Sequence, residues 1–310
     1  MTKLLMNTQP SRTSHRLAKT LLALIQSPWV PRALGQRVWW RVAARCVGAR
    51  FERELVVDGR RFRVPIVVGL NDQLIIEEMQ AYDQEVFILI RRLFANSRPV
   101  ILDVGGNRGQ YVLRLKASWP MAEIHTFEPF PQLAALLREL ATVNQWGGLF
   151  VNQCLLGHAP GTGHLFFDGT ETTTASTVAG FQSNHRHSIE VERTTLDDYV
   201  RQAGLNRIDL LKIDVEGGEL EVIEGAAQML TQLRPLVLME LLWTQNLEHL
   251  TRQRRVIALL RDAGYNFHLI KMDGTLEYQA VPQPDPHYRL LNFLISPTPS
   301  AATASCASAA

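Results

Sequence analysis

The sequence has little cysteine and lacks any long apolar run. Its three cysteines, Cys46, Cys154 and Cys306, lie far apart and form no Cys-x-x-Cys pair, which argues against a disulfide framework or a zinc site and favours a reducing compartment. The apolar stretches at 21–25 and 38–47 are too short, or too interrupted by arginine, for a membrane span of about 20 residues. We therefore expect a cytoplasmic protein without a transmembrane helix.

Acidic residues are missing from the first 50 positions. This stretch contains two Lys and seven Arg, whereas the whole chain has a net charge of +2, so residues 51–310 carry −7. The pattern predicts one or two basic amphipathic helices, split at Pro28-Trp29-Val30-Pro31. Such an arm could pack beside the main domain or lie on an anionic membrane surface, which would place the protein at the periphery of the inner membrane.

A third use of the arm is to grip nucleic acid. Trp29, Trp39 and Trp40 lie among its basic residues, and aromatic rings can stack on bases while cations hold phosphates. However, the remainder of the chain is acidic, and no Asn/Asp-Pro-Pro-Tyr motif of amino-methylating enzymes occurs. A nucleic-acid methyltransferase is therefore the alternative rather than the main prediction.

Strands and helices are predicted to alternate after an N-terminal hairpin. Residues 51–68 alternate apolar and charged side chains around Asp58-Gly59, which predicts a two-stranded flap, and a helix is expected within 73–94. Seven strands follow, at 99–104, 123–128, 148–155, 207–214, 234–241, 265–270 and 287–295, with helices such as 131–144, 217–231 and 251–263. This alternation predicts an α/β fold with a doubly wound sheet covered on both faces.

The predicted organisation has three parts. Residues 1–72 form the basic arm and flap, and residues 73–297 form the main domain, in which 157–200 break the strand–helix rhythm as an insertion near the pocket. The tail at 298–310 is rich in Ser, Thr and Ala and is expected to be disordered.

Glycines follow the first predicted strand of the sheet. In VILDVGGNRGQY, Gly105, Gly106 and Gly109 form a bend at the carboxyl end of the strand, where ligands bind in open α/β sheets. The dinucleotide fingerprint G-x-G-x-x-G would also need glycine at positions held by Asn107 and Gln110. A nicotinamide-dependent oxidoreductase is therefore not expected.

Carboxylates at the ends of two strands suggest the ligand instead. Asp103 would repel a pyrophosphate but suits an ammonium group, and Glu128, at the end of the next strand, could accept hydrogen bonds from a ribose diol. An amino-acid head and a ribose without phosphate describe S-adenosylmethionine. Alternatively, Asp103 could cap the helix, and Glu128 could serve as an acid at the start of the helix after Pro129.

A second group of acids follows the fourth and fifth strands. Asp214 and Glu216 lie in IDLLKIDVEGGELEVIEGA, and Glu240 ends LVLME, so Asp214 and Glu240 could face one cavity from neighbouring strands. Close carboxylates can raise one pKa and create a general base, or can hold a divalent metal such as Mg²⁺. Acids further along, at Glu219, Glu221 and Glu224, are interpreted as helix-dipole residues.

These blocks, in this order, resemble the FkbM-type S-adenosylmethionine-dependent methyltransferases over residues 80–270. The resemblance implies a class I methyltransferase fold, with seven strands in the order 3-2-1-4-5-7-6 and the last antiparallel, and O-methylation of a hydroxyl on a sugar or other small molecule. It assigns the cofactor loop to Asp103, Gly105, Asn107 and Gly109, and the ribose acid to Glu128. It assigns the block after the fourth strand to Lys212, Asp214, Glu216 and Gly217. Gly106 and Cys154 replace the alanines usual in the family.

Within the matching blocks we add Gly106, Gln110 and Asn152 to the cofactor candidates. The candidate bases for the acceptor hydroxyl are, in order, Asp214, Glu240 and Glu216, with His185 and His187 in the insertion as weaker candidates. The sequence motifs do not specify one acceptor, and they are compatible with catalysis with or without Mg²⁺.

Overall fold

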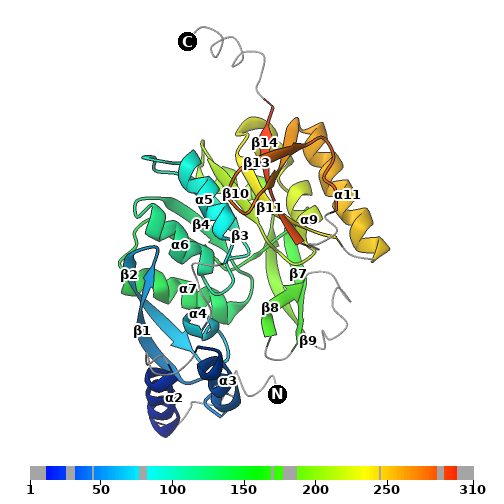
Figure 1. Cartoon of the computed structure of the whole chain (residues 1–310). Coiled ribbons are helices and arrows are strands. Elements are labelled where there is room, and N and C mark those ends of the chain that lie inside the picture. Colours follow the sequence, from blue (N-terminus) through cyan, green and yellow to red (C-terminus); the bar gives the residue numbers. More distant parts are fainter. Residues whose placement is uncertain are drawn as a thin grey trace.

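The computed structural model describes residues 12–25, 32–43, 45–76, 82–168, 171–176, 187–243, 246–284 and 290–298. Two N-terminal helices and a hairpin lie at one end, a central sheet with helices on both faces forms the body, and a second, smaller sheet lies beside it (Figure 1). The predicted tail beyond residue 298 lies outside the described residues.

The central sheet has eight strands in the order β13-β12-β14-β11-β10-β3-β4-β5. They are β3 (Val100–Val104), β4 (Glu123–Phe127), β5 (Leu149–Asn152), β10 (Leu210–Ile213), β11 (Leu236–Leu242), β12 (Tyr265–Ile270), β13 (Leu276–Gln279) and β14 (Leu290–Pro297). From β5 to β12 these are the third, second, first, fourth, fifth, seventh and sixth strands expected from the sequence, and β14 is antiparallel to both of its neighbours. The predicted count of seven is wrong because β13 adds a strand at the edge.

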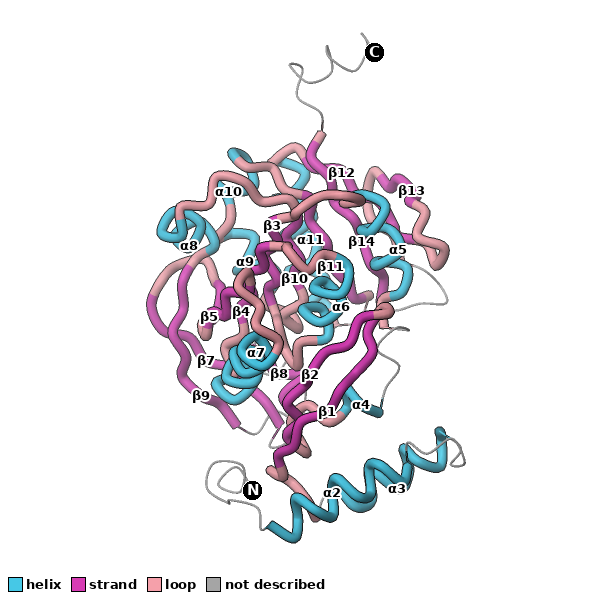
Figure 2. Tube along the Cα trace, turned by 90° about the vertical axis from the view of Figure 1, so that its left-hand side faces the viewer, coloured by secondary structure: helices cyan, strands magenta, loops and turns pink. Residues whose placement is uncertain are grey.

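Helices cover both faces of this sheet, as Figure 2 shows. On one face lie α5 (Gln84–Leu93), α6 (Gln110–Ser118) and α7 (Pro131–Val143); on the other lie α8 (Leu196–Ala203), α9 (Glu219–Glu224), α10 (Ala227–Gln232) and α11 (Leu247–Asp262). Ile101 packs in the core under α5 and α6, and Leu102 packs in the core under α8 to α11, because successive strand residues point to opposite faces. The predicted doubly wound α/β class is confirmed.

Two predicted helices are interrupted. The helix expected at 73–94 consists of α4 (Gln73–Ile76) and α5, and Asp83 immediately before α5 has a left-handed backbone with φ 48°, which a continuous helix cannot contain. The helix expected at 217–231 is divided into α9 and α10 at Gly225, where a Cβ would lie 2.1 Å from the carbonyl oxygen of Gly157. The second break therefore coincides with a close tertiary contact, and the first with the left-handed backbone of Asp83.

The N-terminal arm contains two helices and is followed by the predicted hairpin. The helices are α2 (Arg12–Ile25) and α3 (Arg32–Ala43), and the hairpin is β1 (Arg50–Val57) and β2 (Arg60–Val67), joined at Asp58 and Gly59, both with positive φ. Trp39 is completely buried, and its indole Nε1–H donates to Asp72 Oδ2 at 2.6 Å. One face of the arm thus packs on the body.

No described helix is both long and apolar enough to cross a membrane.

The tip of the hairpin is anchored rather than free. Asp58 forms ion pairs with Arg91 of α5 and Arg114 of α6, and the guanidinium of Arg114 lies 3.7 Å from the centre of the Phe87 ring. Since Arg114 is almost fully buried, this connection holds the turn against the body. The hairpin is therefore fixed at its turn, and its role as a flap stays a prediction.

The insertion forms a separate sheet of four strands in the order β6-β9-β7-β8. The strands are β6 (Leu155–Leu156), β7 (Gly161–Asp168), β8 (Glu171–Ser176) and β9 (His187–Thr194). Phe167 of β7 packs edge-on against Phe130, at the start of α7, with ring centres 5.3 Å apart. This contact holds the small sheet beside the carboxyl ends of the central strands.

Candidate functional site

The glycine bend joins β3 to α6. Gly105 and Gly109 have φ of 88° and 87°, and Gly109 is the residue immediately before α6. A Cβ on Gly105 would lie 1.9 Å from the carbonyl oxygen of Asp214, and one on Gly106 would lie 2.2 Å from Thr126 Oγ1. These glycines are thus required by contacts within the chain, a different reason from the expected approach of a ligand.

Alanine at Gly105 is expected to destabilise the protein more than alanine at Gly59, by at least about 2 kcal/mol, because only Gly105 combines a positive φ with a main-chain clash. Gly59 is the matched control, since its φ is 81° but a Cβ there would meet nothing within 4 Å. Urea unfolding of both variants measures the difference. Equal losses of stability in the two variants would contradict the close approach of Gly105 to Asp214.

Glu128 is brought against the glycine bend. It is buried, and its two carboxylate oxygens accept hydrogen bonds from the main-chain N–H groups of Asn107, at 2.7 Å, and Phe130, at 2.8 Å. Burial raises the pKa of Glu128 to about 7, although the two N–H donors oppose this effect. The structure therefore places two predicted cofactor residues, Glu128 and Asn107, in direct contact.

Asn107 has features of a ligand-binding residue. Its φ is 44°, which is uncommon for a residue with a side chain, and its buried Oδ1 has no hydrogen-bond partner among the described residues. The cofactor candidate Gln110 is the first residue of α6, directly after the bend, and is half-buried. The unpartnered oxygen beside Glu128 fits a bound nucleoside, so the residues present suit the cofactor suggested by the sequence.

Asp103 lies deeper than expected. Its side chain is 0% exposed, Oδ2 accepts a hydrogen bond from Thr126 Oγ1 at 2.9 Å, and Oδ1 is 3.2 Å from Lys212 Nζ. The expectation that this carboxylate faces an open crevice is wrong, because a buried charge needs a partner and Lys212 supplies it. Its assignment to the cofactor site stays a prediction.

Lys212 connects the glycine bend to the acidic loop. Its Nζ donates to the carbonyl oxygen of Gly105 at 2.8 Å, lies 3.4 Å from Asp214 Oδ2 and sits over the Tyr111 ring. Burial alone would lower the pKa of Lys212, but Asp103 and Asp214 outweigh it and raise the pKa to about 12. One cation thus holds the ends of β3 and β10 together.

The three predicted bases lie together at the ends of β10 and β11. Asp214, Glu216 and Glu240 line one cleft, which also contains His249, Arg252 and apolar side chains such as Leu241. Burial, then Asp214, raises the pKa of Glu240 to about 8 and that of Glu216 to about 7. The predicted clustering of these carboxyl groups is therefore present, and two of them can exchange protons near neutral pH.

Tyr82 and Asp83 belong to this region but were not predicted. Burial and the charges of Asp214 and Asp83 raise the pKa of Tyr82 above its ordinary range, and Asp83 accepts hydrogen bonds from the Tyr111 hydroxyl and the Asn292 amide. Burial also raises the pKa of Asp83, although the hydrogen bond from Tyr111 opposes this effect. Its left-handed backbone is the physical feature that could have marked it, but nothing in the local sequence signals it.

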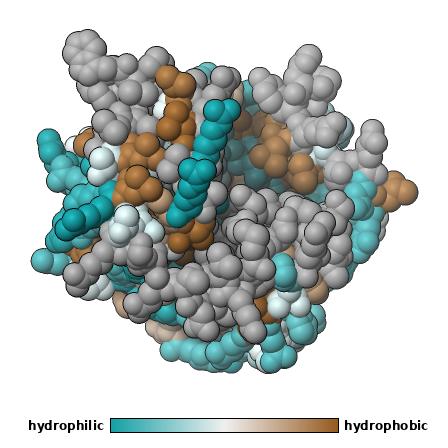
Figure 3. All heavy atoms as spheres, turned by 90° about the horizontal axis from the view of Figure 1, so that it is seen from below, coloured by the Kyte–Doolittle hydropathy of each residue, from teal (hydrophilic) through white to brown (hydrophobic). Residues whose placement is uncertain are grey.

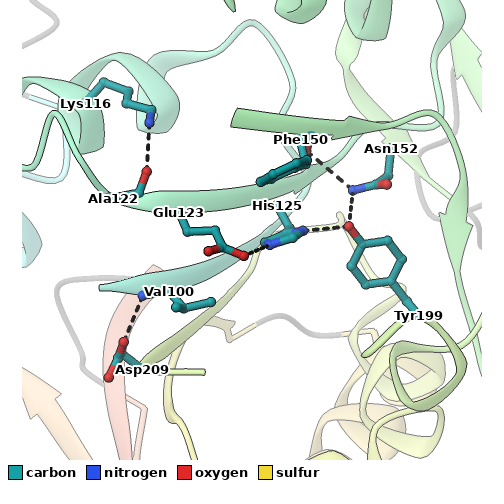
Figure 4. Close-up of polar contacts among 9 residues, drawn as sticks. All are labelled: Val100, Lys116, Ala122, Glu123, His125, Phe150, Asn152, Tyr199 and Asp209. Carbon is teal, nitrogen blue, oxygen red and sulfur yellow. Dashed lines mark hydrogen bonds and ion pairs between the residues drawn. The ribbon is translucent and has the colours of Figure 1, made fainter. Parts of the chain in front are cut away.

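Within the described part of the chain, the side chain of Asn152 forms a hydrogen bond with Tyr199 and not with the glycine bend. Its Nδ2 donates to the Tyr199 hydroxyl at 3.1 Å, and that hydroxyl is 2.6 Å from His125 Nδ1, in a cluster stacked on Phe150 (Figure 4). The main-chain carbonyl of Asn152, by contrast, accepts from the N–H of Glu128 at 3.0 Å. Asn152 thus lies next to the site through its backbone, and its contact with the cofactor stays a prediction.

The insertion reaches the acidic loop through Ser176, whose hydroxyl donates to the carbonyl oxygen of Glu216 at 2.6 Å. His187 lies on β9 with its ring against Phe167, and His185 lies outside the described residues. Among the described side chains, no group of three or more His, Cys, Asp or Glu has an arrangement suited to a metal ion. Metal binding by the acidic cleft remains a prediction without an identified ligand set.

Comparison with known proteins shows to which family the chain belongs. The methyltransferase FkbM domain matches residues 103–267. Methyltransferase sdnD of Sordaria araneosa is 31% identical over 198 residues, which are 55% of this chain and 74% of that protein. The 2-O-methyltransferase NoeI of Sinorhizobium fredii is 32% identical, covering 44% of this chain and 60% of NoeI, and the 31-O-demethyl-FK506 methyltransferase FkbM of Streptomyces tacrolimicus is 27% identical, covering 41% and 58%.

The doubly wound sheet, its glycine bend and the domain match define an S-adenosylmethionine-dependent methyltransferase. The chain belongs to the FkbM methyltransferase family, as its sequence resemblance implied. It spans about three-fifths of the length of the NoeI and FkbM relatives.

Proposed function

We propose that this enzyme methylates a hydroxyl oxygen of a sugar or another small natural product. The observation that supports the proposal is the lysine connection, in which Lys212 Nζ contacts both Gly105 O and Asp214 Oδ2 and so joins the glycine bend to the acidic cleft. Two relatives support hydroxyl chemistry, since their names describe 2-O and 31-O methyl transfer.

The residues at the bend would hold the cofactor. Glu128 can accept hydrogen bonds from a ribose diol while it keeps its two main-chain donors, because each carboxylate oxygen has two lone pairs, and Asn107 Oδ1 offers a further acceptor. When bound, S-adenosylmethionine supplies a methyl group on a positively charged sulfur. The neighbouring carboxylates favour that charge, so the chain is electrostatically suited to the cofactor before transfer.

The acidic cleft would then prepare the acceptor. Asp214, nearest the bend, would orient the hydroxyl, and Glu240 would take its proton as the new oxygen–carbon bond forms. The proton would move from the hydroxyl to the Glu240 carboxylate while the bond between the methyl group and the sulfur breaks, so the products would be a neutral methyl ether and the neutral thioether S-adenosylhomocysteine. A neutral, polyhydroxylated acceptor suits this cleft, because an anionic group would be repelled by its carboxylates.

The test is a screen of hydroxylated acceptors with S-adenosylmethionine labelled on the methyl group, run with and without Mg²⁺. We expect label to enter the hydroxyl of a neutral sugar or polyol as a methyl ether, and the Asp214→Asn variant to lose transfer while S-adenosylhomocysteine still binds by calorimetry. Transfer to nitrogen or carbon only, or full activity of Asp214→Asn, would contradict the proposal. Arg255→Gln, on the exposed side of α11, is the control variant.

A further inference from the structure

A basic surface covers the outer side of the two N-terminal helices. Helices α2 and α3 lie side by side at one end of the molecule (Figures 1 and 2). We call this the arm surface and define it by six exposed residues on the helices and on the turn that follows α3: Arg16, Leu17, Lys19, Leu34, Arg41 and Arg45. No acidic residue occurs among the first 50 positions, so nothing in this segment neutralises the four cations.

Leucines lie exposed among these cations. Leu17 is 48% exposed and Leu34 is 53% exposed, and Leu34 and Arg41 are seven residues apart, so they share one face of α3. Seen from this end, hydrophobic and hydrophilic side chains are interspersed on the surface (Figure 3). Mixed leucine and basic side chains are typical of helices that lie in a lipid–water interface.

The inner side of the helices is already occupied. Ala18 of α2 and Trp39 and Ala43 of α3 are buried in a cluster with Ala49 and Val68. The arm surface is therefore not needed to hold the helices on the body. It is also poorly suited to nucleic acid, because Trp39, one of the rings that could stack on bases, is completely buried.

We propose that the arm surface docks on an anionic lipid bilayer. The charge of +9 in residues 1–50 is attracted to acidic headgroups, whereas the remaining −7 is repelled, so the molecule would bind by this end. Leu17 and Leu34 would enter the headgroup region and add a hydrophobic contribution. This inference does not depend on the chemistry of the acceptor.

The experiment is flotation of the full chain with vesicles of phosphatidylcholine alone or with 30% phosphatidylglycerol (roughly the anionic fraction that gives a strong surface charge). We expect binding to the anionic vesicles only, and loss of binding at about 0.5 M salt, where exposed charges are screened. The triple variant Arg16→Gln/Arg41→Gln/Arg45→Gln should lower the partition coefficient about 100-fold, at about five-fold per charge.

Two further variants make the outcome specific. Leu17→Ser/Leu34→Ser should bind anionic vesicles more weakly, whereas Arg254→Gln/Arg255→Gln/Arg261→Gln, which removes three exposed charges from α11, should bind as the parent does. Equal flotation with both vesicle types, equal losses in the α11 variant, or binding to RNA in preference to anionic vesicles would overturn the proposal. Transfer to a soluble acceptor should be unchanged in the arm variants, which separates this test from that of the proposed function.

Discussion

Replacing Glu240 by glutamine is expected to lower kcat by about 10²–10⁴-fold, the usual contribution of a general base. Glutamine keeps the shape of the side chain but cannot accept a proton. Because burial and Asp214 raise the pKa of Glu240 to about 8, the carboxyl group is mostly protonated below that pH and becomes a base above it. The parent enzyme should therefore show a rate that rises with pH up to about 8.

The measurement is the pH profile of kcat for the parent and Glu240→Gln with a saturating acceptor. Glu248→Gln, at an exposed position in α11, is the matched control and should keep the parental profile. Binding of S-adenosylhomocysteine should be the same in all three proteins. An unchanged rate in Glu240→Gln would remove this residue from the proton-accepting role and leave Glu216 as the next candidate.

Replacing Lys212 by methionine is expected to lower the free energy of unfolding by about 3–5 kcal/mol, because it leaves a buried carboxylate without its cation. Asp103 is fully buried, and of its two partners among the described residues the Thr126 hydroxyl alone would remain. The carbonyl of Gly105 would also lose a hydrogen bond, so cofactor binding should weaken. Urea denaturation of the cofactor-free protein measures the first effect and calorimetry the second.

A second substitution makes this prediction specific. In Lys212→Met/Asp103→Asn the buried negative charge is absent, so the double variant should be more stable than Lys212→Met alone. Lys271→Met is the control, since the Lys271–Glu277 pair is about half exposed on both sides and should contribute little to stability. A loss in Lys212→Met as small as that in Lys271→Met would show that the buried pair does not stabilise the fold.

The strands of the main sheet could be predicted because their apolar runs are long and separated by helix-forming segments. The hairpin was equally clear, since Asp58-Gly59 supplies the positive φ values that its turn requires. By contrast, β13 is a four-residue edge strand whose side chains are mostly exposed, so it has no hydrophobic pattern to detect. The break before α5 was missed because the left-handed Asp83 has neither glycine nor proline beside it.

The candidate site shows a similar division. The sequence placed Glu128, Asp214 and Glu240 at strand ends, and the structure brings the last two into one cleft. It did not reveal that Lys212, 109 residues after Asp103, would neutralise that carboxylate. Pairing across such a separation depends on the order of strands, which local spacing does not encode. For the same reason Tyr82 was missed, although it lies close to Asp214 and Asp83.

The contact between Trp39 and Asp72 makes the arm part of the folded unit. The Asp72 carboxylate is fully buried and accepts hydrogen bonds from the indole of Trp39 and from the N–H of Gly69. Leu70, which follows Gly69, accepts a hydrogen bond through its main-chain carbonyl from Arg108 in the glycine bend. Deleting the first fifty residues would thus remove the indole that covers the Asp72 carboxylate, which is connected to the glycine bend through Gly69 and Leu70. In a family member without these helices an Asp at this position would lose its indole donor, so we expect an Asp here to occur together with the helices when related sequences are compared.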